Sequence, residues 1–353
     1  MIFSRKKIDT ALNEFNQNVK PVSLYQDAWK RLRKNRMALL GLGVVLFYFL
    51  ISILAPILPL YPYARQEMRH INLPPSFQNA GTVMIHNREA YLARVMASEG
   101  RSEYNAAEKA ELETMRKEIE TDDIHNRVYI MGTDVLGRDL LARTLYGGRI
   151  SLGIGVVGTI TALIIGIIWG AIAGYAGGRI DNLMMRFVDI IYGLPYMMVV
   201  IVMMALFGGR SIFLLFIAIA MVSWLTISRV VRGQVISLKN SEFIEAARSV
   251  GAGTPRIIVK HLLPNVLGII IVYSSLSFPT FILSESFLSF LGLGVSAPMA
   301  SWGSLISDGV KGMQMYPWLL LVPAIIMTIF LFAMNFLGDG LRDAFDPQGK
   351  NRT

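Results

Sequence analysis

The sequence contains no cysteine, which excludes disulfide bonds, thiolate chemistry and cysteine-based metal sites. Charged residues are scarce, at 17% of 353 residues against about 25% in a typical soluble domain. The four histidines (His70, His86, His125 and His261) form no ligand-spaced pair, so we expect ordinary surface or interface side chains and no metal site. The phosphate-binding pattern G-x-x-x-x-G-K-[ST], a Ser/His/Asp set and paired carboxylates are also missing. We therefore expect a chain that is not an enzyme and that binds no cofactor.

Apolar residues make up 53% of the chain, and several long stretches carry no charge. Each stretch is near or above the roughly 20 residues that a helix needs to cross about 30 Å of hydrocarbon. In lipid the backbone polar groups must be satisfied within the segment, so these stretches should be helical. The charge-free intervals are 37–64, 150–178, 190–209, 211–228, 262–284 and 312–338. We predict an all-α polytopic membrane protein with six transmembrane helices. The first is too long, and too far from the amino terminus, for a secretory signal peptide.

Lysine and arginine gather in segments that this topology places on one side of the membrane. Residues 1–36 carry nine of them, and residues 229–260, between the fourth and fifth spans, carry six. Basic residues are enriched in cytoplasmic loops, so we predict that both termini lie in the cytoplasm. This asymmetry accounts for the net charge of +9, and because no groove-reading motif accompanies the bases, we expect no nucleic-acid partner.

The spans divide the chain into predicted segments. They are a basic cytoplasmic segment 1–36, a first transmembrane helix 37–60, an external loop 61–149 with a helical insertion, a five-helix core 150–338 containing the loop 229–265, and a cytoplasmic tail 339–353. Residues 65–149 carry twelve bases and thirteen acids and exceed the roughly 60 residues over which the orientation rule acts. Within them, 105–123 is typical of a solvated helix, with Asn105 as its cap and Glu108 three residues later.

Two glycine-containing stretches also carry predictions. Gly166, Gly170 and Gly174 recur every four residues in the second span, a spacing that lets two helices approach closely, although a glycine-rich chain can produce it by chance. The uncharged stretch 286–307 is rich in Gly, Ser and Pro, and we interpret it as a re-entrant or surface segment rather than a seventh span.

Glu285 is the sole acid between residues 262 and 307, and an acid at such depth is a candidate functional residue. It follows Asn265 by about 30 Å of helix, at 1.5 Å per residue. It therefore either emerges at the outer interface in a packing role or lines a translocation path.

The segment 240–265 predicts a helix–turn–helix on the side of the termini, leading into the fifth span through Leu263-Pro264. The residues that carry this pattern are Asn240 or Ser241 as the cap, Glu242 and Glu245 in the first turns, Gly251 or Gly253 at a left-handed end, and Thr254 as cap with Pro255 as first residue of the second helix. Such a short helix can form in any loop between spans, so its geometry alone leaves function open.

The residues Glu245-Ala246-Ala247, then Gly251, then Leu263-Pro264 resemble the EAA loop of ABC importer permeases. The resemblance implies that this loop is a coupling helix seated in a groove of a cytoplasmic ATPase. Glu245 would make an ionic or hydrogen-bonding contact there, while Ala246, Ala247 and Gly251 would allow a close fit and the helix exit. The sequence departs from the family pattern at His261, where an aliphatic residue is usual.

Further stretches resemble the dipeptide/oligopeptide class of these permeases, most of all its C-type subunit. They are 132–152, 174–195, 285–294, 301–309 and 338–347, so that the likeness covers the first span and most of 132–347. The insertion at about 66–128 is longer than usual in that subunit, and nothing is transferred to it. The resemblance implies the type I importer fold and a bacterial inner-membrane location.

The same resemblance implies the partners. They would be a second, homologous permease subunit, two ABC ATPase subunits that bind the ATP, and an extracytoplasmic peptide-binding protein. The expected cargo is oligopeptides, with dipeptides, murein peptides and nickel chelates as alternatives. A secondary transporter is the rival of another class, but such proteins usually show repeated halves and intramembrane ion sites. A membrane enzyme or scaffold would not explain the EAA-like loop.

Overall fold

The computed structural model describes residues 24–207 and 212–345, and the described part is helical, with two isolated β-bridges and no named strand. Parts of the predicted segments 1–36 and 339–353, and residues 208–211 at the third and fourth spans, lie outside the described residues. The long helices and their neighbours are α2 (Leu24–Lys34), α3 (Arg36–Leu54), α4 (Ala80–Glu99), α5 (Ala106–Thr121), α6 (Leu140–Ala176), α7 (Gly178–Gly193), α8 (Tyr196–Leu206), α9 (Ile212–Leu238), α10 (Glu242–Ser249), α11 (Thr254–Ile257), α12 (Leu263–Phe290), α13 (Trp302–Gly312) and α14 (Trp318–Phe345). Short turns η1 (Met68–His70), η2 (Asp123–Asn126) and η3 (Ile258–Leu262) complete the order.

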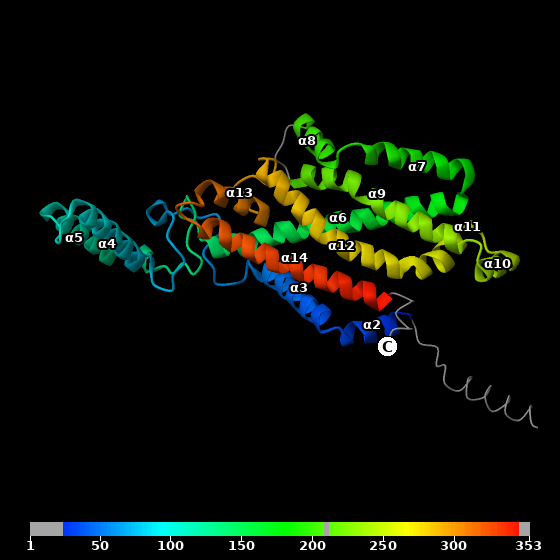
Figure 1. Cartoon of the computed structure of the whole chain (residues 1–353), viewed down its shortest axis with the longest axis horizontal. Helices are drawn as coiled ribbons and strands as arrows, with labels where there is room; N and C mark the ends of the chain where they lie inside the picture. Colours follow the sequence, from blue (N-terminus) through cyan, green and yellow to red (C-terminus); the bar gives the residue numbers. More distant parts are fainter. Residues whose placement is uncertain (1–23, 208–211, 346–353) are drawn as a thin grey trace, which may run out of the picture.

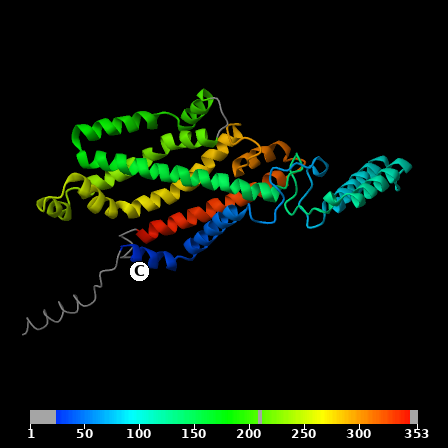
Figure 2. The same ribbon diagram turned by 180° about the vertical axis from the view of Figure 1, so that it is seen from behind.

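The helices α3, α6, α9, α12 and α14 lie side by side along the length of the molecule (Figure 1). The hairpin of α4 and α5 projects from one end of this bundle, as the reverse view also shows (Figure 2). The short helix α10, the helix α2 and the end of α14 lie at the opposite end. The predicted external insertion and the loop 229–265 are therefore at opposite ends of the bundle.

Five helices among the described residues are long and apolar enough to cross a membrane, and α7 with α8 gives a sixth if that pair counts as one span. The pair is bent by 81°, so the third predicted span, 190–209, is wrong as a straight helix. The break falls at Leu194 and Pro195 because proline removes a backbone donor and its ring clashes with the preceding turn.

Several helix ends differ from the charge-free intervals. The first span ends at Leu54 rather than at 60 or 64, since Pro56, Pro59 and Pro62 cannot continue a helix. Its 19 residues still reach about 28 Å. The second span begins ten residues early, at Leu140, because arginine is a good helix former and a charge does not by itself end a helix. Arg143 in this first part is buried, with its Nε 3.3 Å from Asp134 Oδ2. The last three spans likewise run past their charge-free intervals, to Leu238, Phe290 and Phe345.

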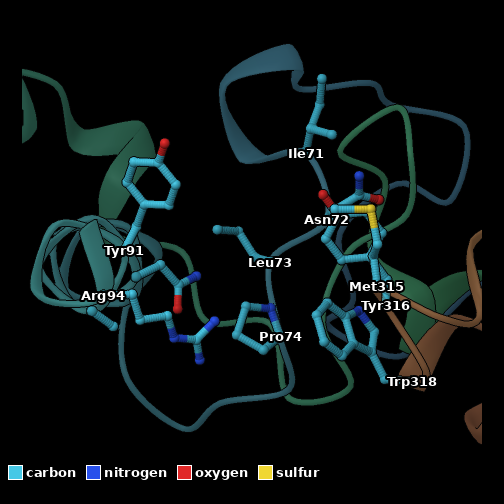
Figure 3. Close-up of a pocket in the computed structure, with 11 residues that line it drawn as sticks. Ile71, Asn72, Leu73, Pro74, Tyr91, Arg94, Met315, Tyr316 and Trp318 are labelled. Carbon is cyan, nitrogen blue, oxygen red and sulfur yellow. The ribbon is translucent and has the colours of Figure 1, made fainter. Parts of the chain in front are cut away.

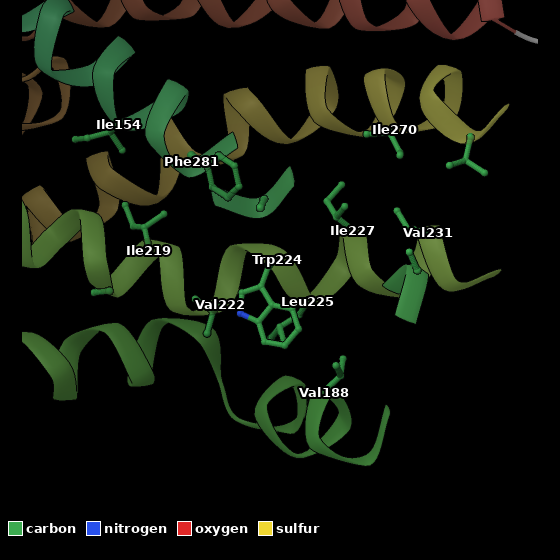
Figure 4. Packing of buried hydrophobic residues seen from close by; sticks show 14 of the residues in the cluster. Ile154, Val188, Ile219, Val222, Trp224, Leu225, Ile227, Val231, Ile270 and Phe281 are labelled. Atoms are coloured by element: carbon green, nitrogen blue, oxygen red, sulfur yellow. The ribbon is translucent and has the colours of Figure 1, made fainter. Parts of the chain in front are cut away.

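The predicted glycine stripe is confirmed as a packing seam between α6 and α9. A Cβ added at Gly166 would lie 2.7 Å from Ile227 Cβ, and one at Gly174 would lie 2.8 Å from the Arg232 carbonyl oxygen. Small residues at these positions let the two backbones approach, as the four-residue spacing requires. Side chains from α6, α9 and α12, among them Ile154, Trp224 and Phe281, fill the main apolar core around this seam (Figure 4).

The insertion is a helical hairpin. The predicted helix is confirmed as α5, and its capping box between Asn105 and Glu108 is present. The sequence did not reveal α4, which packs beside α5 through the ion pairs Arg88–Glu111 (2.7 Å) and Arg116–Glu89 (2.9 Å).

At the base of the hairpin His70 and His125 are buried and their ring nitrogens are 2.9 Å apart. The expectation of surface or interface positions is therefore wrong for these two residues, because the chain folds back on itself between η1 and η2.

The stretch 286–307 forms no seventh span. It completes α12, turns at Gly292, and begins α13, which packs against α12, α14 and α6. Trp302 anchors α13, being 1% exposed and donating its indole N–H to the Thr144 carbonyl of α6 at 3.0 Å.

Candidate functional site

The helix α10 has defined signals at both ends. Its first turn carries Glu242 and Glu245, which the positive end of the helix dipole favours. Ser241 is the cap residue, but its hydroxyl donates to the Leu238 carbonyl at 2.7 Å instead of accepting from the first turn. The helix stops at Gly251, whose φ of +86° is readily available to glycine. The Gly251 N–H donates to the Arg248 carbonyl and the next N–H to the Ala247 carbonyl, which together form a Schellman motif.

One face of α10 is buried and the other is free. Ile244 is fully buried and belongs to the main apolar core, so the helix is packed onto the bundle. The opposite face exposes Glu245 and Ala246, with Phe243 at 41% and Val250 at 89% exposure at its edges. Within the described residues the Glu245 carboxylate has no hydrogen bond or ion pair. This face therefore combines an unpaired acid, a small residue and exposed apolar side chains.

Two basic side chains tie together α10 and the ends of α6 and α9. Arg248 donates to the Lys239 carbonyl at 3.3 Å, and its guanidinium carbon lies 5.6 Å from the centre of the Tyr175 ring. Lys239 in turn donates to the Gly174 carbonyl at 3.1 Å, which satisfies an orphan carbonyl near the end of α6. The sequence marked both bases only as indicators of topology. The sequence did contain one signal for such a contact: a basic residue shortly after a helix can donate a hydrogen bond to a carbonyl group at a helix end.

The other predicted coupling residues are divided between α10 and the helix that follows it. Ala247 is half-buried, and Gly251 is exposed at the end of α10. Leu263 is half-buried and Pro264 is exposed, but they mark no break, because α11, η3 and α12 join from Thr254 to Phe290. The second helix of the loop thus leads into the fifth span through Leu263-Pro264 without interruption.

The turn η3 is a π-helix in which the Leu263 N–H donates to the Ile258 carbonyl. This wider turn accommodates Pro264, whose ring would clash with the carbonyl four residues back in a regular α-helix. The second helix is preceded by Gly253, rather than being capped by Thr254 as expected.

A second ion-pair set holds α7 against α9. Arg232 donates to both carboxylate oxygens of Asp181, at 2.5 and 2.7 Å, and Arg229 donates to Asp189 at 2.8 Å. The bidentate geometry fixes orientation as well as distance. The helices α6, α7, α9 and α10 are thus tied together at the end of the bundle that carries the EAA-like loop.

Glu285 lies in the interior and far from α10. It is 0% exposed, and its Oε1 accepts from the hydroxyls of Ser289 and Ser301, both at 2.6 Å. Its Oε2 lies 3.5 Å from the Ser151 hydroxyl, which itself accepts the Trp302 N–H at 3.0 Å. The carboxyl group therefore joins α6, α12 and the start of α13. The side chain does not reach the surface of the described chain, because α13 folds back over the position, and this buried geometry supports the packing role.

A cleft of about 530 Å³ opens at the end of the bundle opposite α10 (Figure 3). Tyr91 and Arg94 of α4 face Met315, Tyr316 and Trp318 across it, and the segment 71–74 forms its floor. This lining is mostly aromatic and apolar. Among the described residues of the chain, no group of three or more His, Asp or Glu side chains is placed to hold a metal ion.

Comparison with known proteins gives two family matches. Residues 166–350 match the family described as binding-protein-dependent transport system inner membrane component, and residues 23–75 match the N-terminal transmembrane domain of oligopeptide transport permease C. Together the matches reach from α2 to the end of the described chain, outside the insertion and the first part of α6.

Individual relatives are similar over most of their length. The oligopeptide transport system permease protein OppC of Escherichia coli (strain K12) is 40% identical over 99% of this chain and 100% of its own. The protein of the same description from Haemophilus influenzae is 54% identical over 63% of this chain and 71% of its own. The dipeptide transport system permease protein DppC of Bacillus subtilis (strain 168) is 40% identical over 93% of this chain and 87% of its own.

Proposed function

The chain belongs to the family of binding-protein-dependent transport inner membrane components, and from this premise we propose that it forms one half of the membrane channel of an ATP-driven oligopeptide importer. Relatives that match nearly the whole chain are described as oligopeptide transport system permease proteins, which supports this cargo. A dipeptide cargo is the second candidate, supported by the similarity to the dipeptide permease of Bacillus subtilis.

The coupling role is supported by the two faces of α10: one face is packed firmly on the bundle, and the outer face has no partner among the described residues. Ile244 and Arg248 fix α10 to the bundle at the ends of α6 and α9, and Lys239 joins those two ends, so that a force applied to α10 moves these helices with it. The exposed face, with Glu245 at its centre, has no partner among the described residues and is free to dock on another subunit. A switching mechanism needs such a stiff element joined to the spans.

The proposed mechanism draws its energy from separate subunits. Two ABC ATPases bind and hydrolyse ATP, and each docks on one coupling helix, this one and that of a second, homologous permease subunit. Closure of the ATPase pair moves α10 as a rigid body, and α6 and α9 follow because they share the glycine seam. The bundle then exposes its path to the other face. An extracytoplasmic peptide-binding protein delivers the cargo on the side of α4 and α5.

The proposed orientation places α10 and both termini in the cytoplasm of a bacterial inner membrane. It is supported by the excess of basic residues on the α10 side, because such residues accumulate in cytoplasmic segments. The end-to-end separation of α10 from the hairpin of α4 and α5 fits this orientation (Figure 1).

The experiment reverses the charge on the free face of α10. We expect Glu245→Lys to abolish uptake of a labelled tripeptide while the protein stays in the membrane and loses its co-purifying ATPase subunits. The matched control is Glu113→Lys, which makes the same change on the exposed face of α5 at the opposite end of the molecule. Undiminished uptake by Glu245→Lys would refute the coupling role.

A further inference from the structure

An apolar groove of about 380 Å³ lies between α6 and the helical segment that links α10 to α12. Its walls are Ile167, Ile168, Ala171 and Ile172 on α6, and Thr254, Pro255, Ile258, Val259 and Leu263 on the linking segment. Three of these side chains are well exposed, namely Ile168 at 57%, Ile172 at 45% and Val259 at 61%. The groove is thus an open furrow in the flank of the bundle rather than an enclosed core cavity.

The depth of the groove favours an acyl chain as its occupant. The α6 residues lie about 6 to 14 Å before the end of that helix at Ala176, at 1.5 Å per residue. With α6 crossing the membrane, this places the furrow where the acyl chains of one leaflet begin. Water gains no hydrogen bonds from side chains of this kind, whereas a hydrocarbon tail replaces the missing apolar contacts.

Positive charge lies beside the groove. Arg256 and Lys260 are one turn apart on the linking segment, directly next in sequence to the lining residues Pro255 and Val259. Both side chains are exposed, and neither has a hydrogen-bond or ion-pair partner among the described residues. Two exposed cations on a segment that lines an apolar furrow, each next in sequence to a lining residue, complement a phosphate attached to an acyl tail.

We propose that this groove binds one anionic phospholipid, with an acyl chain between α6 and the linking segment and its phosphate on Arg256 and Lys260. The orientation of the proposed function makes it a lipid of the cytoplasmic leaflet, and to that extent the proposal rests on that function. The lipid occupies the space between α6 and the base of the coupling segment. It therefore braces α10 against α6 from the side that the contacts of Arg248 do not reach, and it makes coupling sensitive to the anionic lipid content of the membrane.

Lipid binding is tested on the intact transporter, delipidated in detergent and analysed by native mass spectrometry. The added probes are phosphatidylglycerol and phosphatidylcholine with identical acyl chains. Each basic side chain near a lipid surface contributes roughly fivefold in affinity, so Arg256→Gln with Lys260→Gln should weaken one phosphatidylglycerol adduct about 25-fold. The phosphatidylcholine adducts should not change. Ile172→Trp, which fills the furrow and leaves both cations in place, should remove the same adduct.

The control removes two positive charges at the same end of the bundle but away from the furrow, by Arg179→Gln with Arg186→Gln on α7. Loss of the adduct in this control as strongly as in the test variant would overturn the proposal, since it would show general charge attraction. Retention of the adduct by Ile172→Trp would also overturn the proposal. The same holds if a glycerophosphate without acyl chains displaces the lipid as effectively as unlabelled phosphatidylglycerol does.

Reconstitution separates this proposal from the coupling proposal. In vesicles of phosphatidylcholine with about one quarter phosphatidylglycerol, we expect uptake by the Arg256/Lys260 variant to fall to the level of wild type in phosphatidylcholine alone, while the ATPase subunits remain bound. Dissociation of the ATPases from this variant, with the lipid adduct unchanged, would assign the two cations to the ATPase interface and overturn the lipid site.

Discussion

The glycine seam between α6 and α9 allows a stability prediction with an internal control. A Cβ at Gly170 would contact the Ser228 carbonyl oxygen, and would lie 2.9 Å from Val231 Cβ and 3.0 Å from the Arg232 nitrogen. Carbon contacts are comfortable at about 3.5 to 4.0 Å, so Gly170→Ala must push the helices apart by about 0.5 to 1 Å. Overpacking of this kind costs about 1 to 3 kcal/mol, against a gain of about 0.5 to 1 kcal/mol in helix propensity.

Gly153 on the same helix provides the control, because a Cβ added there meets nothing within 4 Å. Gly153→Ala should therefore gain the helix propensity without the clash. We expect the two variants to differ in stability by about 1 to 3 kcal/mol, measured as the thermal unfolding midpoint of the purified complex by tryptophan fluorescence. A difference of this size corresponds to several degrees.

The same displacement should reach the coupling site. The carbonyl of Gly174, one turn after Gly170, accepts a hydrogen bond from Lys239, and the ring of Tyr175 contacts the guanidinium of Arg248. Separation of α6 from α9 loosens both contacts, so Gly170→Ala should lower peptide uptake more than it lowers ATPase binding. Equal melting midpoints and equal uptake for Gly170→Ala and Gly153→Ala would refute the reasoning, because they would show that the seam has room for a methyl group.

Two further predictions concern buried polar groups. Glu285→Ala should lower the stability of the protein by about 3 kcal/mol, roughly 1 kcal/mol for each of the three serine hydroxyls that contact the carboxylate. Glu285→Gln should retain most of the wild-type stability and the peptide selectivity. A thermal midpoint for Glu285→Ala equal to wild type would contradict this prediction. Burial and the neighbouring charge of His125 lower the pKa of His70 from 6.5 to about 4, with Arg127 and Arg69 acting in the same direction and Glu67 opposing them. The folded insertion therefore keeps His70 neutral, so its stability is complete above pH 6.5 and falls by at most about 3 kcal/mol as the pH drops toward 4. After correction for the pH dependence of intrinsic exchange, the amide protection factors of residues 122–133 should fall between pH 7.5 and 5 in wild type and stay constant in His70→Gln. An equal fall in both proteins would assign the effect elsewhere.

The sequence predicted what depends on local composition. Charge-free length located the spans, and the cap at Asn105 and the left-handed glycine at Gly251 were identified because each signal lies within a few residues. Helix ends were less predictable, because the first charged residue limits a charge-free interval but does not end a helix. Arg143 lies inside α6, and its ion pair with Asp134 becomes apparent only in the fold. The α4 helix was missed because its apolar side chains are divided between α5 and the base of the insertion.

The polar contacts that fix the site depend on residues far apart in sequence, and for that reason the sequence could not show them. The partners of Glu285 come from α6, α12 and the start of α13, so its side chain looked like a lone membrane acid although hydroxyls surround it. Lys239 and Arg248 likewise counted as topological charges until Gly174 and Tyr175 lay beside them. In both cases polar side chains link separate helices. The apolar pattern of the sequence predicts that these helices are buried, but it does not predict which residues of one helix lie beside which residues of the next. Apolar burial therefore sets which helices pack, whereas these contacts tie particular helices together, and the proposed coupling role depends on these ties between α10, α6 and α9.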